Sequence, residues 1–244
     1  MPSIAYVLPA HNEERALPEF VPPLALRLKE LPGSEIIIVE NGSSDTTGAV
    51  AEQLATECSS ADVRVRAESS AKGYGNAVRR GIEVATAERV MLTAADLPFG
   101  FSDLDAALAL EPLPEVVIGS KAHKQSKVNV NLQRKVMSKT FWALRKVLLH
   151  VDVGDSQGTI LIERDLGQSL LPELQSGAYF FSTELIVLAS RTGARVVEVP
   201  VDYSNPRRDS KVKPIHDSVQ VLKDMWTLRT RLRTPAVQGP SSKR

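Results

Sequence analysis

Short runs of β-branched and other apolar residues alternate with longer segments of helical pattern along most of this chain. The runs are SIAYVLP, EIIIVE, VRVRAE, ERVMLTA and EVVIGS. Strands that alternate with helices form parallel sheets, because each crossover helix returns the chain to the same end of the sheet. Ile36 to Val39 is an unbroken apolar run, as expected of a strand that helices cover on both faces. The sequence therefore predicts an α/β fold with a mostly parallel central sheet flanked by helices.

The length of the chain, 244 residues, is enough to bury one sizeable core. We expect a single domain over residues 1–213, in which a helix covers 128–150. An amphipathic helix is predicted over 214–234, because its apolar residues fall near one side and basic residues elsewhere. The tail over 235–244 is low in apolar residues and is predicted to be disordered.

The composition narrows the class of protein. Hydrophobic residues make up 43% of the chain and charged residues 24%, which is the composition of an ordinary soluble protein. The net charge is +1, so the overall charge does not favour any class of partner. The single cysteine, Cys58, excludes an internal disulfide and favours a reducing compartment. Because we find neither a signal peptide nor a run of about 18 apolar residues, we expect a cytoplasmic protein that does not span a membrane.

Polar motifs follow three of the predicted strands: PAHNEE, ENGSSDTTG and AADLPFG. Ligands of open α/β sheets bind beyond the carboxyl ends of the strands, so these loops are expected to meet in one cleft. Two interpretations of the first two loops stay open. Asn12 and Asp45 suit the N-caps of the helices that follow, with Glu13 in a first turn. The same loops also suit a ligand site, where Glu40 and Asn41 would bind a nucleobase edge or ribose hydroxyls.

The segment KGYGNAVRRG places two close glycines before a helix. A dinucleotide fingerprint would need a third glycine three residues after the second and a position in the first strand-to-helix turn, and this segment meets neither requirement. A glycine-rich entry to a helix still lets a phosphate approach the backbone, and Lys72 adds positive charge. We therefore predict a nucleotide-contacting turn that is not a Rossmann dinucleotide site.

These motifs, with GSKAH, DSQGT, FSTELIVLA and EVPVDYSNPRRDSKV, occur in the order found in inverting family 2 glycosyltransferases of the GT-A fold. Over residues 3–213 the chain resembles the polyprenyl-phosphate sugar synthases, which include the dolichyl-phosphate glucose and mannose synthases. The resemblance implies a single-domain, Rossmann-like GT-A fold. It also implies transfer of a hexose, with inversion, from a GDP- or UDP-linked sugar to a polyprenyl phosphate.

The resemblance also implies roles for individual residues. The nucleotide-binding positions are Pro9, Asn12, Glu13, Glu40, Asn41, Lys72, Gly73, Gly75 and Asp96. The catalytic positions are Asp96, Asp155 and Gln157. The positions expected to bind the acceptor and its phosphate are Lys121, Arg134, Arg207, Arg208 and Lys211.

The metal-binding motif of the family is altered in this chain. Asp96 matches the last carboxylate of the Asp-x-Asp motif, Ala94 replaces the first, and Pro98 stands where some relatives carry a metal-binding glutamine. Three alternatives stay open. Asp96 binds Mg²⁺ or Mn²⁺ weakly and only together with the substrate, or Lys and Arg side chains neutralise the diphosphate instead. In the third, catalysis has been lost and the protein only binds a nucleotide sugar.

Residues 118–151 include eight Lys or Arg, no Asp or Glu, and the aromatic pair Phe141 and Trp142. Such a segment suits a lipid phosphate and an anionic membrane surface. We therefore expect peripheral contact with the cytoplasmic face of a membrane. The chain has no recognised nucleic-acid-binding motif, so no nucleic-acid partner is expected.

The chemistry of the acceptor decides what the site must do. A lipid monophosphate is already anionic near neutral pH, because the second pKa of a phosphate monoester is about 6. It can attack the anomeric carbon without a strong general base. A glycan hydroxyl, the alternative acceptor, would need a base, and Asp155 is the obvious carboxylate for that role. Two other roles of Asp155 stay open, which are binding of the sugar hydroxyls and the organisation of Lys and Arg side chains.

Overall fold

A computed structural model describes residues 1–128, 132–203 and 214–233 of the protein. Its main sheet has seven strands in the order β3-β2-β1-β4-β7-β5-β8. These strands are β1 Ile4–Ala10, β2 Ser34–Glu40, β3 Val63–Ser69, β4 Arg89–Leu92, β5 Val116–Ser120, β7 Thr159–Glu163 and β8 Val196–Pro200. A separate parallel pair joins β6 Lys127–Val128 to β9 Asp202–Tyr203.

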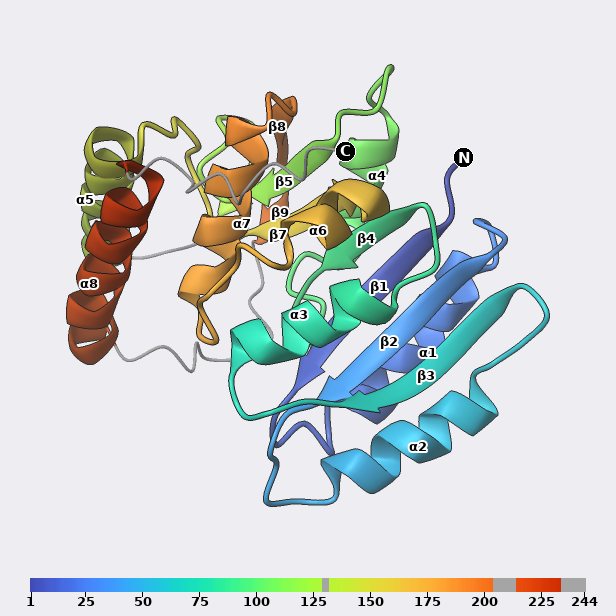
Figure 1. The fold of residues 1–244 in the computed structure, drawn as a ribbon. Helices are drawn as coiled ribbons and strands as arrows, with labels where there is room; N and C mark the ends of the chain where they lie inside the picture. Colours follow the sequence, from blue (N-terminus) through green and yellow to red (C-terminus); the bar gives the residue numbers. More distant parts are fainter. Residues whose placement is uncertain (129–131, 204–213, 234–244) are drawn as a thin grey trace, which may run out of the picture.

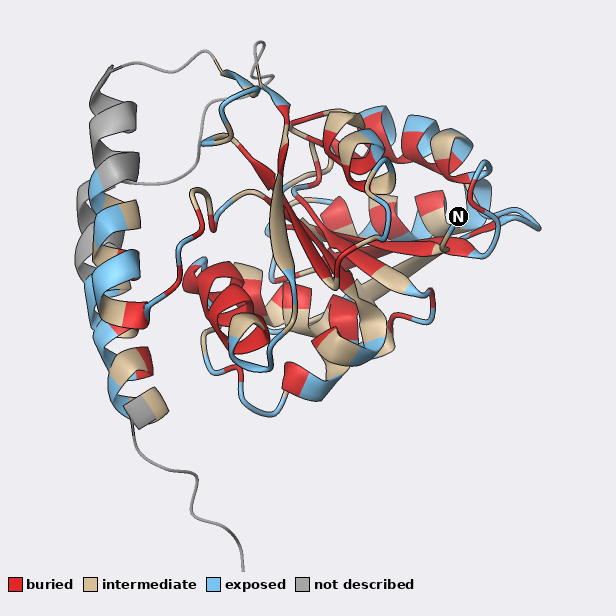
Figure 2. Cartoon of the chain, turned by 90° about the horizontal axis from the view of Figure 1, so that it is seen from above, coloured by how far each residue is buried: buried red, intermediate tan, exposed pale blue. Residues whose placement is uncertain are grey.

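Helices cover both faces of the main sheet (Figure 1). They are α1 Leu17–Leu28, α2 Thr47–Glu57, α3 Tyr74–Val84, α4 Ser102–Leu108, α5 Leu132–Leu149, α6 Arg164–Leu170, α7 Phe180–Arg191 and α8 Pro214–Arg233. The strands lie buried between the helical layers (Figure 2), and the apolar side chains form two clusters, one on each face of the sheet. One cluster includes residues of α3, α6 and α7, and the other includes residues of α1, α2 and α4. The predicted α/β fold is confirmed.

One strand of the sheet, β7, breaks the parallel pattern. It runs antiparallel to β4 and β5, with Leu92 paired to Ile160 and Gly119 paired to Thr159. The sequence analysis did not identify this strand. Because it runs in the opposite direction, β7 begins at the edge of the sheet where β4 and β5 end. The segment just before β7 therefore lies beside the loops that follow β4 and β5.

The helices α5 and α8 pack against each other beside the main body of the fold (Figure 1). Met225 and Leu228 of α8 are buried in the same apolar cluster as Leu149 of α5. Arg229 donates hydrogen bonds to the carbonyl oxygens of Val147 at 3.2 Å and Leu148 at 3.1 Å. The helix predicted over 214–234 is thus present as α8, whereas the predicted tail over 235–244 lies outside the described residues.

A helix that crosses a bilayer needs about 20 predominantly apolar residues. Within the described ranges, no helix combines the length and the apolar character needed to span a bilayer.

Close packing of α3 on β1 depends on Gly81, because a Cβ atom there would overlap the side chain of Val7. We expect Gly81→Ala to lower the free energy of unfolding by about 1–3 kcal/mol, as other overpacked cores do. Gly48→Ala in α2 is the matched control, since its new Cβ would meet only Glu40 Cγ at 3.8 Å. Alanine favours helix, so the control should be neutral or stabilising. Urea denaturation measures both, and equal effects would contradict this role for Gly81.

Candidate active site

The site that the sequence predicts lies along one edge of the main sheet. Strands β1, β2 and β3 end there, because Ala10 pairs with Glu40 and Glu40 pairs with Ser69. β4 runs parallel to β1 and ends at the same edge. The loops after these parallel strands therefore converge, as is usual for a ligand site in an open α/β sheet.

The loops after β1 and β2 are joined by hydrogen bonds. Asn12 Oδ1 accepts the backbone N–H of Ser44 at 2.8 Å, and the Asn12 N–H donates to Ser43 Oγ at 3.1 Å. The Glu13 N–H donates to Thr47 Oγ1 at 2.8 Å. Asn12 has a φ of 56°, a left-handed conformation that asparagine tolerates better than most residues. These contacts make the two loops one rigid unit.

The prediction that Asn12 caps the first helix is wrong. The prediction that Asp45 bonds the N-terminus of the second helix is confirmed. The helix α1 begins only at Leu17, so neither Asn12 nor Glu13 lies in its first turn. Asp45 Oδ1, in contrast, accepts the N–H of Thr47, the first residue of α2, at 3.0 Å. This bond, and more strongly the bond from the Thr47 hydroxyl, lowers the pKa of Asp45.

Glu40 and Asn41 lie at the carboxyl end of β2, as predicted. Glu40 accepts the backbone N–H of Ser43, which fixes the turn. Asn41 is only 4% exposed, and its Oδ1 has no hydrogen-bond partner among the residues that the structure describes. A buried acceptor without a donor is costly, so such atoms commonly mark places where water or a ligand supplies the donor.

The glycine-rich turn before α3 is shaped by another segment of the protein. Gly73 has a φ of 128°, and a Cβ there would overlap the carbonyl oxygen of Gly177. A Cβ on Gly75 would lie 2.6 Å from Ser176 O, and the Gly75 N–H donates to Gly177 O at 2.9 Å. We predicted that these glycines let a phosphate approach the backbone. The close approach in the structure is made by the backbone of residues 176–177.

Glu184 of α7 holds that segment in place. The side chain is 2% exposed, and its Oε2 accepts the N–H groups of Gln175 at 3.0 Å and Ser176 at 2.9 Å. Its Oε1 pairs with Arg231 of α8 at 2.5 Å. Sequence reasoning missed Glu184, although an acidic residue inside the apolar run FSTELIVLA was the available signal. A buried carboxylate of this kind requires fixed partners.

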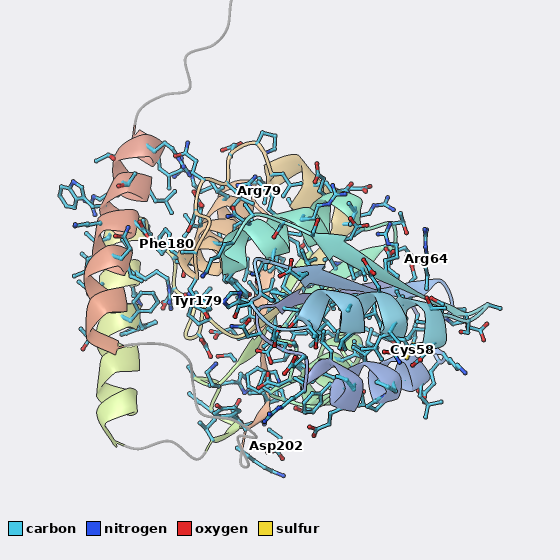
Figure 3. The ribbon with its side chains drawn as sticks, turned by 90° about the horizontal axis from the view of Figure 1, so that it is seen from below. Cys58, Arg64, Arg79, Tyr179, Phe180 and Asp202 are labelled. Carbon is cyan, nitrogen blue, oxygen red and sulfur yellow. The ribbon has the colours of Figure 1, made fainter. Side chains whose placement is uncertain are left out.

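An aromatic contact joins the same two regions. Tyr179, labelled in Figure 3, precedes α7 and stacks on Tyr74 of α3 with ring centroids 5.2 Å apart. The Tyr74 hydroxyl lies 3.4 Å from Ser182 Oγ. The turn at Gly73 and Gly75 is therefore fixed on one side by backbone and aromatic contacts from 176–182.

Three of the predicted residues, Lys121, Asp155 and Gln157, form a second cluster. Asp155 Oδ2 accepts both the Lys121 backbone N–H at 3.1 Å and the Lys121 ammonium at 3.0 Å. Asp155 Oδ1 accepts the Gln157 N–H at 3.0 Å. The Lys121 ammonium also lies 5.3 Å from the ring centroid of Phe99, in the loop after β4. The antiparallel direction of β7 makes this cluster possible, because Asp155 precedes β7 and Lys121 follows β5.

Glu198 of β8 fixes the backbone of the same cluster. Its Oε2 accepts the Gly154 N–H at 2.8 Å and its Oε1 accepts the Asp155 N–H at 3.1 Å. Sequence reasoning did not identify Glu198, since an alternating polar residue in a strand gave no sign of a specific partner. The position of Asp155 thus depends on contacts from both β5 and β8.

The carboxylate expected to bind a metal, Asp96, lies half-buried in the loop after β4, and Ala94 is exposed in the same loop. Across 1–128, 132–203 and 214–233, no group of three or more His, Cys, Asp or Glu is arranged to hold a metal ion. One carboxylate fits Mg²⁺ or Mn²⁺ only if other oxygens complete the coordination.

Four predicted phosphate-binding side chains cannot be placed. Arg207, Arg208 and Lys211 lie outside the described residues. Arg134 belongs to α5, but its side chain is also outside the description. The structure therefore leaves their roles as predictions.

Known proteins resemble this chain in sequence over most of its length. The model of the family Glycosyl transferase family 2 matches residues 6–164. Glycosyltransferase AglD of Haloferax volcanii is 30% identical over 242 residues, which are 94% of this chain and 38% of AglD. Human dolichyl-phosphate beta-glucosyltransferase is 28% identical over 249 residues, 96% of this chain and 76% of that protein. This chain therefore spans well under half of AglD and about three quarters of the human protein.

Solved structures confirm the predicted GT-A fold. Mannosyl-3-phosphoglycerate synthase of Rubrobacter xylanophilus superposes with a TM-score of 0.65 at 16% identity, covering 99% of this chain and 79% of the other. Glucosyl-3-phosphoglycerate synthase of Mycobacterium tuberculosis, solved with Mg²⁺ and UDP, superposes with a TM-score of 0.63 at 18% identity. The superposition covers 94% of this chain and 80% of the other. At sequence identities of 16% and 18%, this similarity shows that the proteins share a fold.

The buried pair of Glu184 and Arg231 gives a testable prediction. Glu184→Gln keeps the size of the side chain but leaves Arg231 without its carboxylate and weakens the bonds to residues 175–176. We expect the free energy of unfolding to fall by about 1–3 kcal/mol. Glu83→Gln on the exposed face of α3, whose carboxylate pairs with Arg80 at 2.9 Å, is the matched control. Its effect should stay below about 1 kcal/mol. Similar losses in both variants would show that the buried pair has no special role.

Proposed function

Because the chain belongs to glycosyl transferase family 2, we propose that it transfers a hexose, with inversion, from a GDP- or UDP-linked sugar to a polyprenyl phosphate. The observation that carries the proposal is the cluster of Lys121, Asp155 and Gln157, which lies at the same edge of the sheet as the loops that follow β1, β2 and β4. The names of the dolichyl-phosphate beta-glucosyltransferases support the acceptor, and the solved complexes with UDP support the nucleotide donor.

The nucleotide is assigned to the edge formed by the first two loops. Asn41 offers an unpartnered oxygen to an N–H or O–H of the base or ribose, and Asn12 holds the loops in position. The N-terminus of α3, with Lys72 before it, attracts the diphosphate through the positive end of its dipole. Pro9, Glu13, Glu40, Gly73 and Gly75 complete the proposed nucleotide-binding set.

The acceptor phosphate is assigned to the side of Lys121. Its oxygen forms the new bond to the anomeric carbon as the bond from that carbon to the nucleoside diphosphate breaks. Lys121 offsets the charge of the incoming phosphate, and Asp155 holds the ammonium at 3.0 Å. Since both oxygens of Asp155 already accept hydrogen bonds, the carboxylate is arranged to orient Lys121. This favours a phosphate acceptor over a hydroxyl acceptor, which would need Asp155 as a free base.

A divalent cation is proposed as a partner of the donor. Asp96 would hold Mg²⁺ or Mn²⁺ together with the diphosphate, which fits the habit of Mg²⁺ to bind one or two carboxylates and substrate phosphates. The ion, when bound, offsets negative charge on the leaving nucleotide. Solved structures of the same fold with Mg²⁺ or Mn²⁺ and UDP support this assignment.

Contact with a membrane is assigned to α5 and α8. Val147 is 68% exposed and Trp226 is 59% exposed, and the same two helices carry exposed basic residues such as Lys146 and Lys223. Exposed tryptophan and basic residues suit the headgroup region of an anionic bilayer. We therefore place the protein at the cytoplasmic face of a membrane, where a polyprenyl phosphate is embedded.

The proposal is tested by release of nucleoside diphosphate from UDP- and GDP-sugars, with and without a short polyprenyl phosphate. We expect acceptor-dependent release in Mn²⁺ or Mg²⁺ and its loss in EDTA, because Asp96 and the diphosphate must share the ion. Asp96→Ala should reduce turnover by about 100-fold or more. Survival in EDTA would transfer the role to Lys and Arg side chains. Nucleotide binding without release from any pair would favour a binding protein or another acceptor.

The acceptor side is tested separately with Lys121→Met. Removal of the ammonium should raise the KM for the polyprenyl phosphate and lower kcat/KM by about 100-fold, as loss of one charge-stabilising donor does in other enzymes. The affinity for UDP or GDP should change by less than about twofold, since the nucleotide is assigned elsewhere. Lys124→Met in the same loop is the matched control. Equal kinetics for both variants would remove Lys121 from the acceptor site.

A further inference from the structure

Arg145 of α5 is a buried cation whose hydrogen-bonding capacity is mostly unused. It is 1% exposed, and its Nη1 donates to Ser156 Oγ at 2.8 Å. Its Nε and Nη2 are buried and have no hydrogen-bond partner in the described part of the chain. Ser156 lies between Asp155 and Gln157. Resting on the proposed function, we propose that Arg145 is a positioning residue that holds the 154–157 loop in the geometry required for an anionic acceptor.

The hydrogen-bond network beyond Ser156 supports the proposal. Ser156 Oγ lies 2.8 Å from Thr183 Oγ1, and the same oxygen of Thr183 accepts Gln157 Nε2 at 3.2 Å. The guanidinium of Arg145 therefore reaches Gln157 through two hydroxyl groups. Because Ser156 and Thr183 are both buried, water cannot easily replace these bonds. The loop is fixed from this side by Arg145 and from the other side by Glu198.

The cost of burying Arg145 indicates that the charge has a purpose beyond packing. Burial lowers the pKa of Arg145, and the nearby carboxylates of Asp155, Glu198 and Asp152 oppose that shift. The Phe141 ring centroid, 5.4 Å from the guanidinium carbon, adds a cation–π contact. A buried charge that is not closely paired is unfavourable unless its surroundings compensate for it. A neutral side chain of similar length would fill the same space without this cost.

The local balance of charge explains why a cation belongs here. Lys121, Lys146 and Arg145 supply three positive charges, and Asp152, Asp155 and Glu198 supply three negative charges. Without Arg145 the cluster would carry a net negative charge and would repel an acceptor phosphate. The effect would be strong because a buried charge is poorly screened by salt. Arg145 thus both fixes the loop and keeps the site compatible with an anion.

The first measurement does not depend on activity. Amide hydrogen exchange of the full-length protein should be about 10-fold faster at residues 154–157 in Arg145→Met, because the loop opens locally when its support is lost. Methionine keeps much of the volume and removes the charge and the donors. Arg89→Met is the matched control, since Arg89 donates to Pro114 O at 2.7 Å near the opposite end of β4. Its exchange at 154–157 should match the wild type.

The second measurement is transfer to a short polyprenyl phosphate. Arg145→Met should lower kcat/KM for the acceptor by about 10- to 100-fold, the loss expected from a misplaced reactive group. Nucleotide affinity should change by less than about twofold. Arg145→Lys, which keeps the charge, should recover part of the acceptor affinity, whereas a packing role predicts no advantage over methionine.

The outcomes separate this inference from the proposed function. No transfer by the wild-type protein would contradict the proposed function, while exchange at 154–157 would still test the positioning role. If Arg145→Met does not fold, Ser156→Ala removes the same 2.8 Å bond with a smaller change and should also speed exchange in the loop. Unchanged exchange and unchanged acceptor KM in the folded variants would overturn the inference.

Discussion

The reversed direction of β7 between β4 and β5 is the constraint on which the rest of the site depends. Register pairs Leu92 with Ile160 and Gly119 with Thr159, so the residues just before β7 meet the loops just after its two neighbours. A parallel strand in this place would start at the far edge of the sheet, about 17–20 Å away for a strand of typical length. The ion pair of Lys121 and Asp155 exists because of this reversal.

Two buried charged residues, Glu184 and Arg145, fix the segments around that edge of the sheet. Each of them joins α5 or α8 to a segment beside the main sheet. Glu184 fixes the backbone of residues 175–176 beside the glycine turn and pairs with Arg231 of α8. Arg145 of α5 supports the 154–157 loop through Ser156. The helices α5 and α8 are thus joined to both halves of the site by polar contacts, which unlike apolar contacts require fixed geometry.

The placement of many candidate residues could be predicted because they follow strands in a recognisable order. Glu40 and Asn41 lie at the end of β2, Asp96 lies in the loop after β4, and Lys121, Asp155 and Gln157 form one cluster. The prediction that Asn12 caps a helix was wrong, because α1 begins only at Leu17. An asparagine side chain has both donors and an acceptor, so it suits more than one local structure. Glu198 and Glu184 were missed because their partners are distant backbone N–H groups.

The α/β class, the strands rich in β-branched residues and the polar loops that follow them can be read from the sequence, because they depend on local periodicity and turn chemistry. The direction of β7, the closeness of residues 176–177 to Gly73 and Gly75, and the burial of Arg145 arise from the packing of distant segments. The physical reason is that strand pairing and the desolvation of charge arise between segments far apart in the chain. A local pattern carries no information about which distant groups will exclude water from a side chain.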